Sequence, residues 1–155
     1  MAQKQVSSFA EWKALEGGEF GVSDYMVIDQ ERIDRFAAAT GDFQWIHTDV
    51  ERAKRESPFG TTIAHGYLTL SLLPPLLAQL VETRNSRMTV NYGVENLRFR
   101  QAVPAGARVR LRAEVQEVKD LRGITRVRIG VIMEVENAKA PVFTGTILLL
   151  YHFES

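Results

Sequence analysis

Two long segments in the second half of the chain alternate between apolar and polar residues, and they constrain the fold more than any other feature. In residues 107–118, "ARVRLRAEVQEV", apolar side chains occupy the odd positions from 109 to 115 and charged side chains the even positions between them. Residues 124–136, "ITRVRIGVIMEVE", alternate again after the turn signal "DLRG". Because successive side chains of a strand point to opposite faces, this pattern predicts an antiparallel meander with one buried face and one wet face.

A segment of a different kind precedes these strands. From Tyr67 to Val81, apolar residues would occur on nearly every face of a helix, which predicts a long helix that is buried all round. Pro74 is expected to interrupt or kink this helix. The predicted fold is therefore α+β, with an antiparallel sheet wrapped around a long central α-helix in one domain spanning residues 1–155.

Capping residues mark the helices of the first half. Ser8 and a glutamate three positions later form a capping box for a first helix, and Asp29 is a cap for a second. Gly41 stands where the second helix is expected to end. Thr48 and Glu51 form another predicted capping box, ahead of the short polar helix "VERAKRE".

Composition excludes several classes of function. The 155 residues include 19 basic and 19 acidic side chains, so neither nucleic acid nor an anionic membrane is expected as the main partner. The absence of cysteine excludes disulfides, thiolate metal ligands and a cysteine nucleophile. The start "MAQKQVSSFAEW" lacks the apolar run of a signal peptide, and no segment reaches the roughly 20 apolar residues of a membrane helix. We expect a cytoplasmic protein.

The segment "ATGDFQWIHTD" places Asp42 and His47 five positions apart. On a continuous helix their side chains would lie roughly 140° apart. If Gly41 ends the helix and a loop follows, both can face one pocket, where an imidazole and a carboxylate can orient a water molecule and remove its proton. The alternative is structural, because Asp after a helix-ending Gly is a common turn former and a loop histidine is more often structural than catalytic.

A second segment, "AHGYLTL", places His65 and Gly66 where the apolar helix begins. The first backbone N–H groups of a helix lack internal partners, and a glycine lets a substrate carbonyl approach them closely. Such an N–H can stabilise an oxyanion or enolate. The structural alternative is that His65 is a polar residue near a helix start and that Gly66 is a packing choice.

Residues 36–77, "FAAATGDFQWIHTDVERAKRESPFGTTIAHGYLTLSLLPPLL", resemble the hydratase motif of the MaoC-like, or R-specific enoyl-CoA hydratase, family of hot-dog folds. That pattern runs from a small residue through Gly, Asp, any residue, Asn, Pro and an aliphatic residue to His, and continues to a downstream Ala-His-Gly. The matching positions are Gly41, Asp42, Ile46, His47, Ala64, His65 and Gly66. Gln44 stands where the family usually has Asn, and Trp45 where it usually has Pro, which concerns substrate range more than reaction type.

The resemblance implies a hot-dog fold and the reversible addition of water to trans-2-enoyl thioesters, giving (R)-3-hydroxyacyl products. It implies that Asp42 and His47 hold and activate the water while the Gly66 N–H binds the thioester oxygen. No metal and no separate cofactor are expected, because coenzyme A is part of the substrate. Two hot dogs normally pair and this chain has room for one, so a homodimer is expected.

Further substrate contacts are expected from three groups of residues. Gln44, Trp45 and His65 lie within the motif, and "NYG" (Asn91, Tyr92 and Gly93) is a candidate wall of the acyl or pantetheine channel. Arginines that could bind the phosphates of coenzyme A, or simply solvate an outer sheet face, are Arg84, Arg87, Arg98 and Arg100.

Two other functions on the same fold remain open from the sequence. One is an acyl-CoA thioesterase, which needs a carboxylate and a water but not this Asp and His arrangement. The other is a non-catalytic acyl-thioester-binding protein, for which the changes at Gln44 and Trp45 leave room. The carrier, coenzyme A or acyl-carrier protein, is also open.

Overall fold

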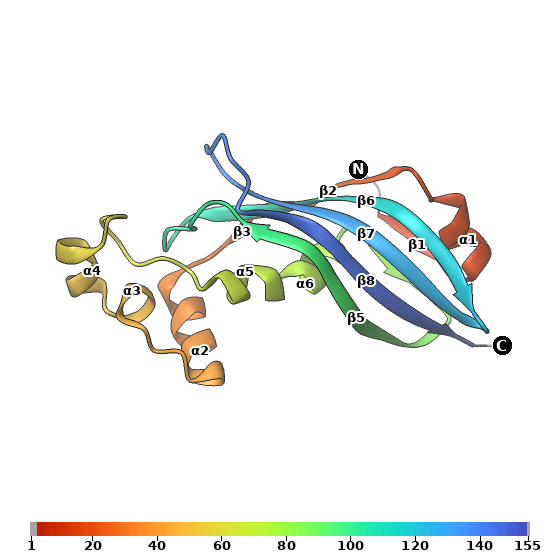
Figure 1. The fold of residues 1–155 in the computed structure, drawn as a ribbon, viewed down its shortest axis with the longest axis horizontal. Helices are drawn as coiled ribbons and strands as arrows, with labels where there is room; N and C mark the ends of the chain where they lie inside the picture. The colour runs from red at the N-terminus through yellow and green to blue at the C-terminus, as the bar shows by residue number, and fades with distance from the viewer. Residues whose placement is uncertain (1–2, 155) are drawn as a thin grey trace.

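A strongly curved antiparallel sheet forms the body of the computed structural model, which describes residues 3–154 (Figure 1). Its strands follow the order β2-β6-β7-β8-β5, and the short β3 also pairs with β6. The strands are β2 (Glu19–Val22), β3 (Met26–Val27), β5 (Ser86–Phe99), β6 (Arg108–Leu121), β7 (Ile124–Val135) and β8 (Phe143–Phe153). The predicted antiparallel meander is therefore confirmed, and β5 is an edge strand.

The alternation in β6 and β7 separates a core face from an outer face, as predicted. Val109 and Leu111 are fully buried. Between them, Arg110 points outward and its Nε donates to Glu134 of β7 over 2.7 Å. The two strands are joined by a tight turn in which Arg122 has φ 55° and Gly123 has φ 91°, the left-handed pair that a two-residue hairpin requires.

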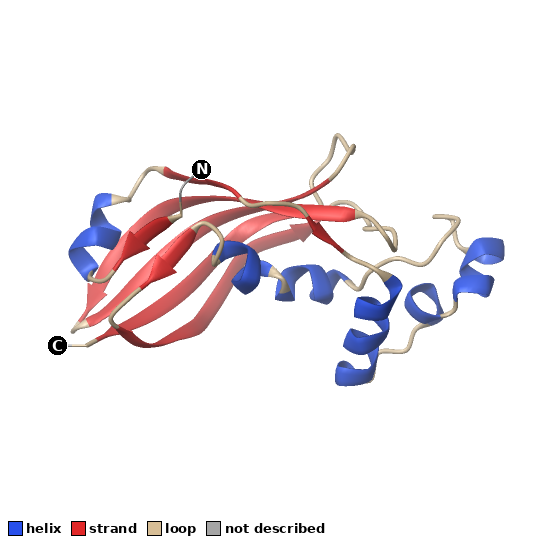
Figure 2. Ribbon diagram, turned by 180° about the vertical axis from the view of Figure 1, so that it is seen from behind, coloured by secondary structure: helices blue, strands red, loops and turns tan. Residues whose placement is uncertain are grey.

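The predicted central helix is interrupted just before Pro74, which confirms one of the two outcomes expected from the sequence. Two short helices, α5 (Gly66–Ser71) and α6 (Leu73–Leu77), lie against the concave face of the sheet (Figure 2). Pro74 and Pro75 fall in the first turn of α6, where a missing N–H costs nothing, so the prolines begin a new helix instead of kinking a continuous one.

The prediction that this segment is buried all round is wrong. Leu76 is fully buried against the sheet, whereas Tyr67 is 71% exposed. The sheet covers these helices from one side, and their other side faces outward. The segment needs its many apolar residues only on the side that packs against the sheet.

Three helices extend beyond one end of the sheet, namely α2 (Gln30–Thr40), α3 (Trp45–Thr48) and α4 (Val50–Glu56) (Figures 1 and 2). The predicted cap of α2 is confirmed, because Asp29 Oδ1 accepts from the Arg32 N–H over 2.9 Å. The predicted cap of α4 is wrong by one residue. Thr48 belongs to α3, and Asp49 caps α4 by accepting from the Arg52 N–H over 2.9 Å.

The opposite end carries α1 (Phe9–Ala14) beside a parallel pair of short strands, β1 (Lys4–Val6) and β4 (Val81–Thr83). The predicted capping box is present, because Ser8 Oγ accepts from the Glu11 N–H over 3.3 Å. Trp12 of α1 is fully buried in the core cluster that α5 and α6 share with the sheet. None of the helices within residues 3–154 combines the length and the apolar character needed to cross a bilayer.

Candidate active site

A left-handed residue ends α2 and turns the chain into the site. Gly41 has φ 78°, and its N–H donates to the Ala37 carbonyl over 2.8 Å, which closes the helix as the sequence predicted. Asp42 therefore leaves the helix axis, and its side chain is 53% exposed. The Gln44 N–H donates to Asp42 Oδ1 over 3.3 Å and restricts the carboxylate.

His47 lies on α3, so the predicted loop between Gly41 and Thr48 contains one short helical turn. The imidazole is 7% exposed, and its Nδ1 lies 2.7 Å from the Ile63 carbonyl oxygen. A carbonyl only accepts, so Nδ1 carries the proton and Nε2 holds a free lone pair. The fold thus presents His47 as a base.

Burial lowers the pKa of His47 below its ordinary value near 6.5. The hydrogen bond to Ile63 opposes this shift, the charge of His65 adds to it, and the charge of Asp42 opposes it. The pKa remains lowered, which keeps the ring neutral and able to accept a proton at pH 7.

His65 packs against both His47 and Asp42. Its ring stacks on that of His47 with centroids 3.9 Å apart, and packs against Phe36 at 4.9 Å. His65 Nε2 lies 3.0 Å from the Asp42 carbonyl oxygen and 4.0 Å from Asp42 Oδ2. The residue is 3% exposed, so the structure places it behind Asp42 and not on a cavity wall.

Asp42, His47 and His65 together bring three potential metal ligands within 4.8 Å of one another. The two rings are stacked with centroids 3.9 Å apart at an interplanar angle of 25°, so their nitrogen lone pairs lie in two separate, nearly parallel planes. A metal ion needs imidazole lone pairs that converge on it. The arrangement therefore suits proton transfer better than metal binding.

A cavity of about 360 Å³ opens beside His47. Gly66, the first residue of α5, lines it together with Phe99 and Arg100 of the segment that ends β5. A Cβ at Gly66 would come within 3.2 Å of the Phe99 ring. A side chain at this position would crowd the Phe99 ring, and the backbone N–H of Gly66 has no partner within the helix.

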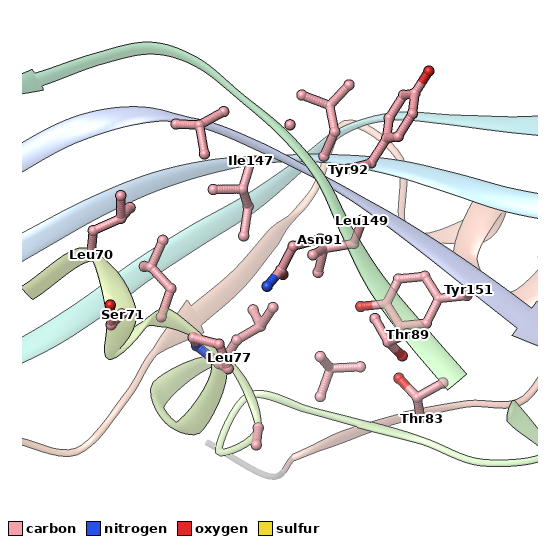
Figure 3. A pocket seen from close by; sticks show the side chains of 17 residues that line it. Leu70, Ser71, Leu77, Thr83, Thr89, Asn91, Tyr92, Ile147, Leu149 and Tyr151 are labelled. Atoms are coloured by element: carbon pink, nitrogen blue, oxygen red, sulfur yellow. The ribbon is translucent and has the colours of Figure 1, made fainter. Parts of the chain in front are cut away.

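A larger groove of about 840 Å³ lies between α5, α6 and the strands β5 and β8 (Figure 3). Asn91, Tyr92 and Gly93, predicted to line a substrate channel, all border it. The Asn91 side chain points into the groove, and the Tyr92 side chain points away from it (Figure 3). Arg98 is exposed on β5 and borders neither the groove nor the cavity beside His47.

The two residues that depart from the family pattern have local roles. The Trp45 ring packs under the Arg52 guanidinium at 4.3 Å from its centroid, a cation–π contact within the α3 and α4 segment. Gln44 is exposed, and its backbone carbonyl accepts from the His47 N–H over 2.9 Å. Both positions shape the turn that carries His47, and neither borders the cavity beside it.

Two contacts that position the site have no signal in the sequence. One is the Ile63 carbonyl, whose side chain gives no hint of its role. The other is Gln30, whose Nε2 donates to the His47 carbonyl over 2.7 Å, and whose Oε1 accepts from Thr62 over 2.5 Å. Only the tertiary fold brings these groups to His47.

A curved antiparallel sheet packed against an interrupted helix is the architecture of a hot-dog fold, and Asp42 and His47 lie on the turn at one end of it. Residues 12–137 match the family described as MaoC like domain. 3-Hydroxyacyl-thioester dehydratase Z of Mycobacterium tuberculosis (strain ATCC 25618 / H37Rv) is 41% identical over 145 residues, which cover 93% of this chain and 95% of that protein. Nodulation protein N of Rhizobium leguminosarum bv. viciae is 40% identical over 150 residues, covering 95% and 92%.

Structural comparison agrees with this result. The unliganded R-hydratase PhaJ1 from Pseudomonas aeruginosa superposes with a TM-score of 0.76 at 26% identity, covering 96% of this chain and 88% of that one. The chain belongs to the MaoC-like domain family. The fold and the family predicted from the sequence are both confirmed.

Proposed function

We propose that this protein is an (R)-specific enoyl-thioester hydratase, which reversibly adds water to a trans-2-enoyl thioester to give the (R)-3-hydroxyacyl thioester. The wider class, a hydro-lyase of the MaoC-like family, follows from the family and from the relatives named above. The observation that carries the finer proposal is the meeting of the Asp42 carboxylate with a neutral, Nδ1-protonated His47 beside an open cavity.

Water activation falls to Asp42 and His47. The lone pair on His47 Nε2 accepts a proton as the water oxygen bonds to C3, and the Asp42 carboxylate orients the water by accepting its second hydrogen. The electron pair of the double bond moves toward the thioester carbonyl. A proton returned by the same pair to C2 then completes the addition, and the reverse sequence dehydrates the product.

The Gly66 N–H supports the developing enolate. Its position at the start of α5, on the wall of the cavity beside His47, suits it to donate to the thioester oxygen. The helix is one short turn and a half, so the hydrogen bond contributes more than the helix dipole. His65 is a positioning residue here, because it holds the backbone of Asp42 instead of facing the cavity.

Coenzyme A or acyl-carrier protein would carry the thioester, and no separate cofactor is required. Arg100 borders the cavity beside His47 and is the best placed arginine for a phosphate of the carrier.

A homodimer is part of the proposal. The edge strand β5 exposes apolar side chains that a second copy would cover, namely Met88, Val90, Tyr92 and Val94.

The test is hydration of crotonyl-CoA by the purified protein, followed as loss of enoyl absorbance, with chiral analysis of the product. We expect turnover to the (R)-3-hydroxy thioester. Release of free coenzyme A, detected with a thiol reagent, would favour a thioesterase. Acyl-CoA binding without either reaction would favour a non-catalytic binding protein, and an (S) product would contradict the stereochemistry.

A further inference from the structure

We propose that the groove between α5, α6, β5 and β8 selects enoyl thioesters whose acyl chain carries an oxygen substituent several carbons from the thioester. The groove is the 840 Å³ depression described above and is called the acyl groove below. This proposal rests on the proposed function, since the groove acts as the acyl subsite of the same reaction.

The cavity beside His47 and the acyl groove are bordered by opposite ends of α5. Gly66, at the start of this helix, borders the cavity beside His47, and Leu70 and Ser71, at its end, border the groove. Six helical residues rise about 9 Å. An acyl chain bound with its carbonyl at Gly66 would therefore enter the groove within its first several carbons.

The charged residues that border each of the two cavities indicate which end of the substrate binds there. None of the residues that border the acyl groove carries a charge. The cavity beside His47 is bordered by Arg100. The phosphates of a carrier require cations, so the groove is suited to the acyl end and not to the carrier.

The walls of the groove are apolar over most of its length. Leu73 and Leu77 come from α6, and Ile147 and Leu149 from β8, and all four are less than 9% exposed. Such walls favour methylene groups, which leave water on binding.

Polar groups gather at the end of the groove farther from α5. Tyr151, which is 3% exposed, lies there with Thr83 and Thr89, and Asn91 directs its amide into the groove nearer its middle (Figure 3). Asn91 and Thr89 are both exposed on β5, and within residues 3–154 neither side chain takes part in a side-chain hydrogen bond. The Asn91 amide and the Thr89 hydroxyl are thus available to a ligand.

A plain alkyl chain in this place would strip water from these groups without replacing its hydrogen bonds. A hydroxyl, ether or keto oxygen on the chain would accept from the Asn91 amide or exchange a hydrogen bond with a threonine. Sites built to hydrogen-bond a substrate oxygen discriminate against analogues that lack it. The distal polar groups therefore favour an oxygenated acyl chain.

The experiment compares hydration of trans-2-dodecenoyl-CoA with a series of counterparts that carry one hydroxyl at successive carbons beyond the fourth. For the full-length protein, we expect at least one counterpart to exceed the plain chain about tenfold in kcat/KM. Asn91→Leu, which replaces the amide by an apolar group of similar size, should remove that preference. Thr89→Val, a smaller change, should reduce it, and Thr144→Val on the outer face should leave it unchanged.

Several results would overturn the proposal. Turnover of crotonyl-CoA with no preference for any hydroxylated chain would overturn the selectivity alone, whereas absence of all hydration would overturn the proposed function as well. An Asn91→Leu protein that keeps the preference would exclude the amide. If Asn91→Leu and Thr89→Val instead change the oligomeric state and slow both substrates equally, a second copy occupies the groove. Circular dichroism of both variants shows that each is folded.

Discussion

The imidazole rings of His47 and His65 stack with their centroids 3.9 Å apart and their planes at 25°. At this distance a positive charge on His65 disfavours protonation of His47 and lowers the pKa of His47. Each ring has a different hydrogen-bond partner, the Ile63 carbonyl for His47 and the Asp42 carbonyl for His65. In this stack His47 is the candidate base, and His65 holds the backbone of Asp42, the neighbouring acid. Substitution of one histidine at a time can separate the two roles.

The pH dependence of hydration should report His47. Burial lowers the pKa of this histidine below its ordinary value near 6.5, and the neutral ring is the active base. Hydration should therefore be constant near pH 7 and fall only as the pH drops below about 6.5. The measurement is kcat/KM for crotonyl-CoA between pH 5 and pH 8. An acid limb centred above pH 7 would contradict a neutral, buried base.

The same shift makes a contribution to stability with a defined sign. A histidine whose pKa is lowered by folding binds its proton more readily in the unfolded chain. Its contribution is fully present above pH 6.5 and is lost as the pH falls through the lowered pKa. His47→Gln keeps a side-chain amide that can donate to Ile63 but cannot titrate, so it should abolish hydration and weaken the fall in melting temperature below pH 6.5.

Replacing the acid should remove catalysis without unfolding the protein. Asp42 is 53% exposed and Asn is nearly the same size, so Asp42→Asn should leave the melting temperature nearly unchanged. Loss of the carboxylate should lower kcat by about 10² to 10⁴. Asp49→Asn is the matched control, because Asn caps α4 as well as Asp does. Equal activity in the two variants would remove Asp42 from the mechanism.

Much of this site could be predicted from the sequence because its signals are local. The glycine that ends α2, the acid after it and the histidine five positions later are adjacent in the chain, as is the glycine at the start of α5. The alternation of β6 and β7 likewise depends only on neighbouring residues. The sequence predicts an interruption or a kink at Pro74 but does not decide between them, because proline suits either a kink or the first turn of a new helix.

The supporting contacts could not be predicted, because they join segments far apart in sequence. The Ile63 carbonyl and the Gln30 amide reach His47 only after α2 and the loop before α5 have packed. The sequence also does not show which way the His65 side chain points. The motif around His65 predicts a substrate contact, whereas in the fold the ring lies against Asp42 and is buried.

Substitution of His65 should slow the reaction because Asp42 is then no longer held in position. His65→Phe keeps a stacking ring but loses the bond from Nε2 to the Asp42 carbonyl, so kcat should fall more than KM rises. It also removes a charge that lowers the pKa of His47, which should move the acid limb toward higher pH. His65→Gln retains a donor and should recover part of kcat. A purely structural role would lower the melting temperature and leave the pH profile unmoved.

The left-handed turn at Gly41 should be needed for activity as well as for stability. Ala at φ 78° is strained by about 1–2 kcal/mol, although no neighbouring atom would contact its Cβ. Gly17, with φ 80° and equally open surroundings, carries the same strain beside α1 at the opposite end of the sheet, so Gly17→Ala is the matched control. The melting temperatures of both variants should fall by similar amounts. Only Gly41→Ala should also lose kcat for crotonyl-CoA, by about tenfold or more, because relief of its strain rotates Asp42 away from His47. Unchanged turnover in Gly41→Ala, measured at a temperature where both proteins are folded, would mean that the turn ends the helix without setting the geometry of the pair.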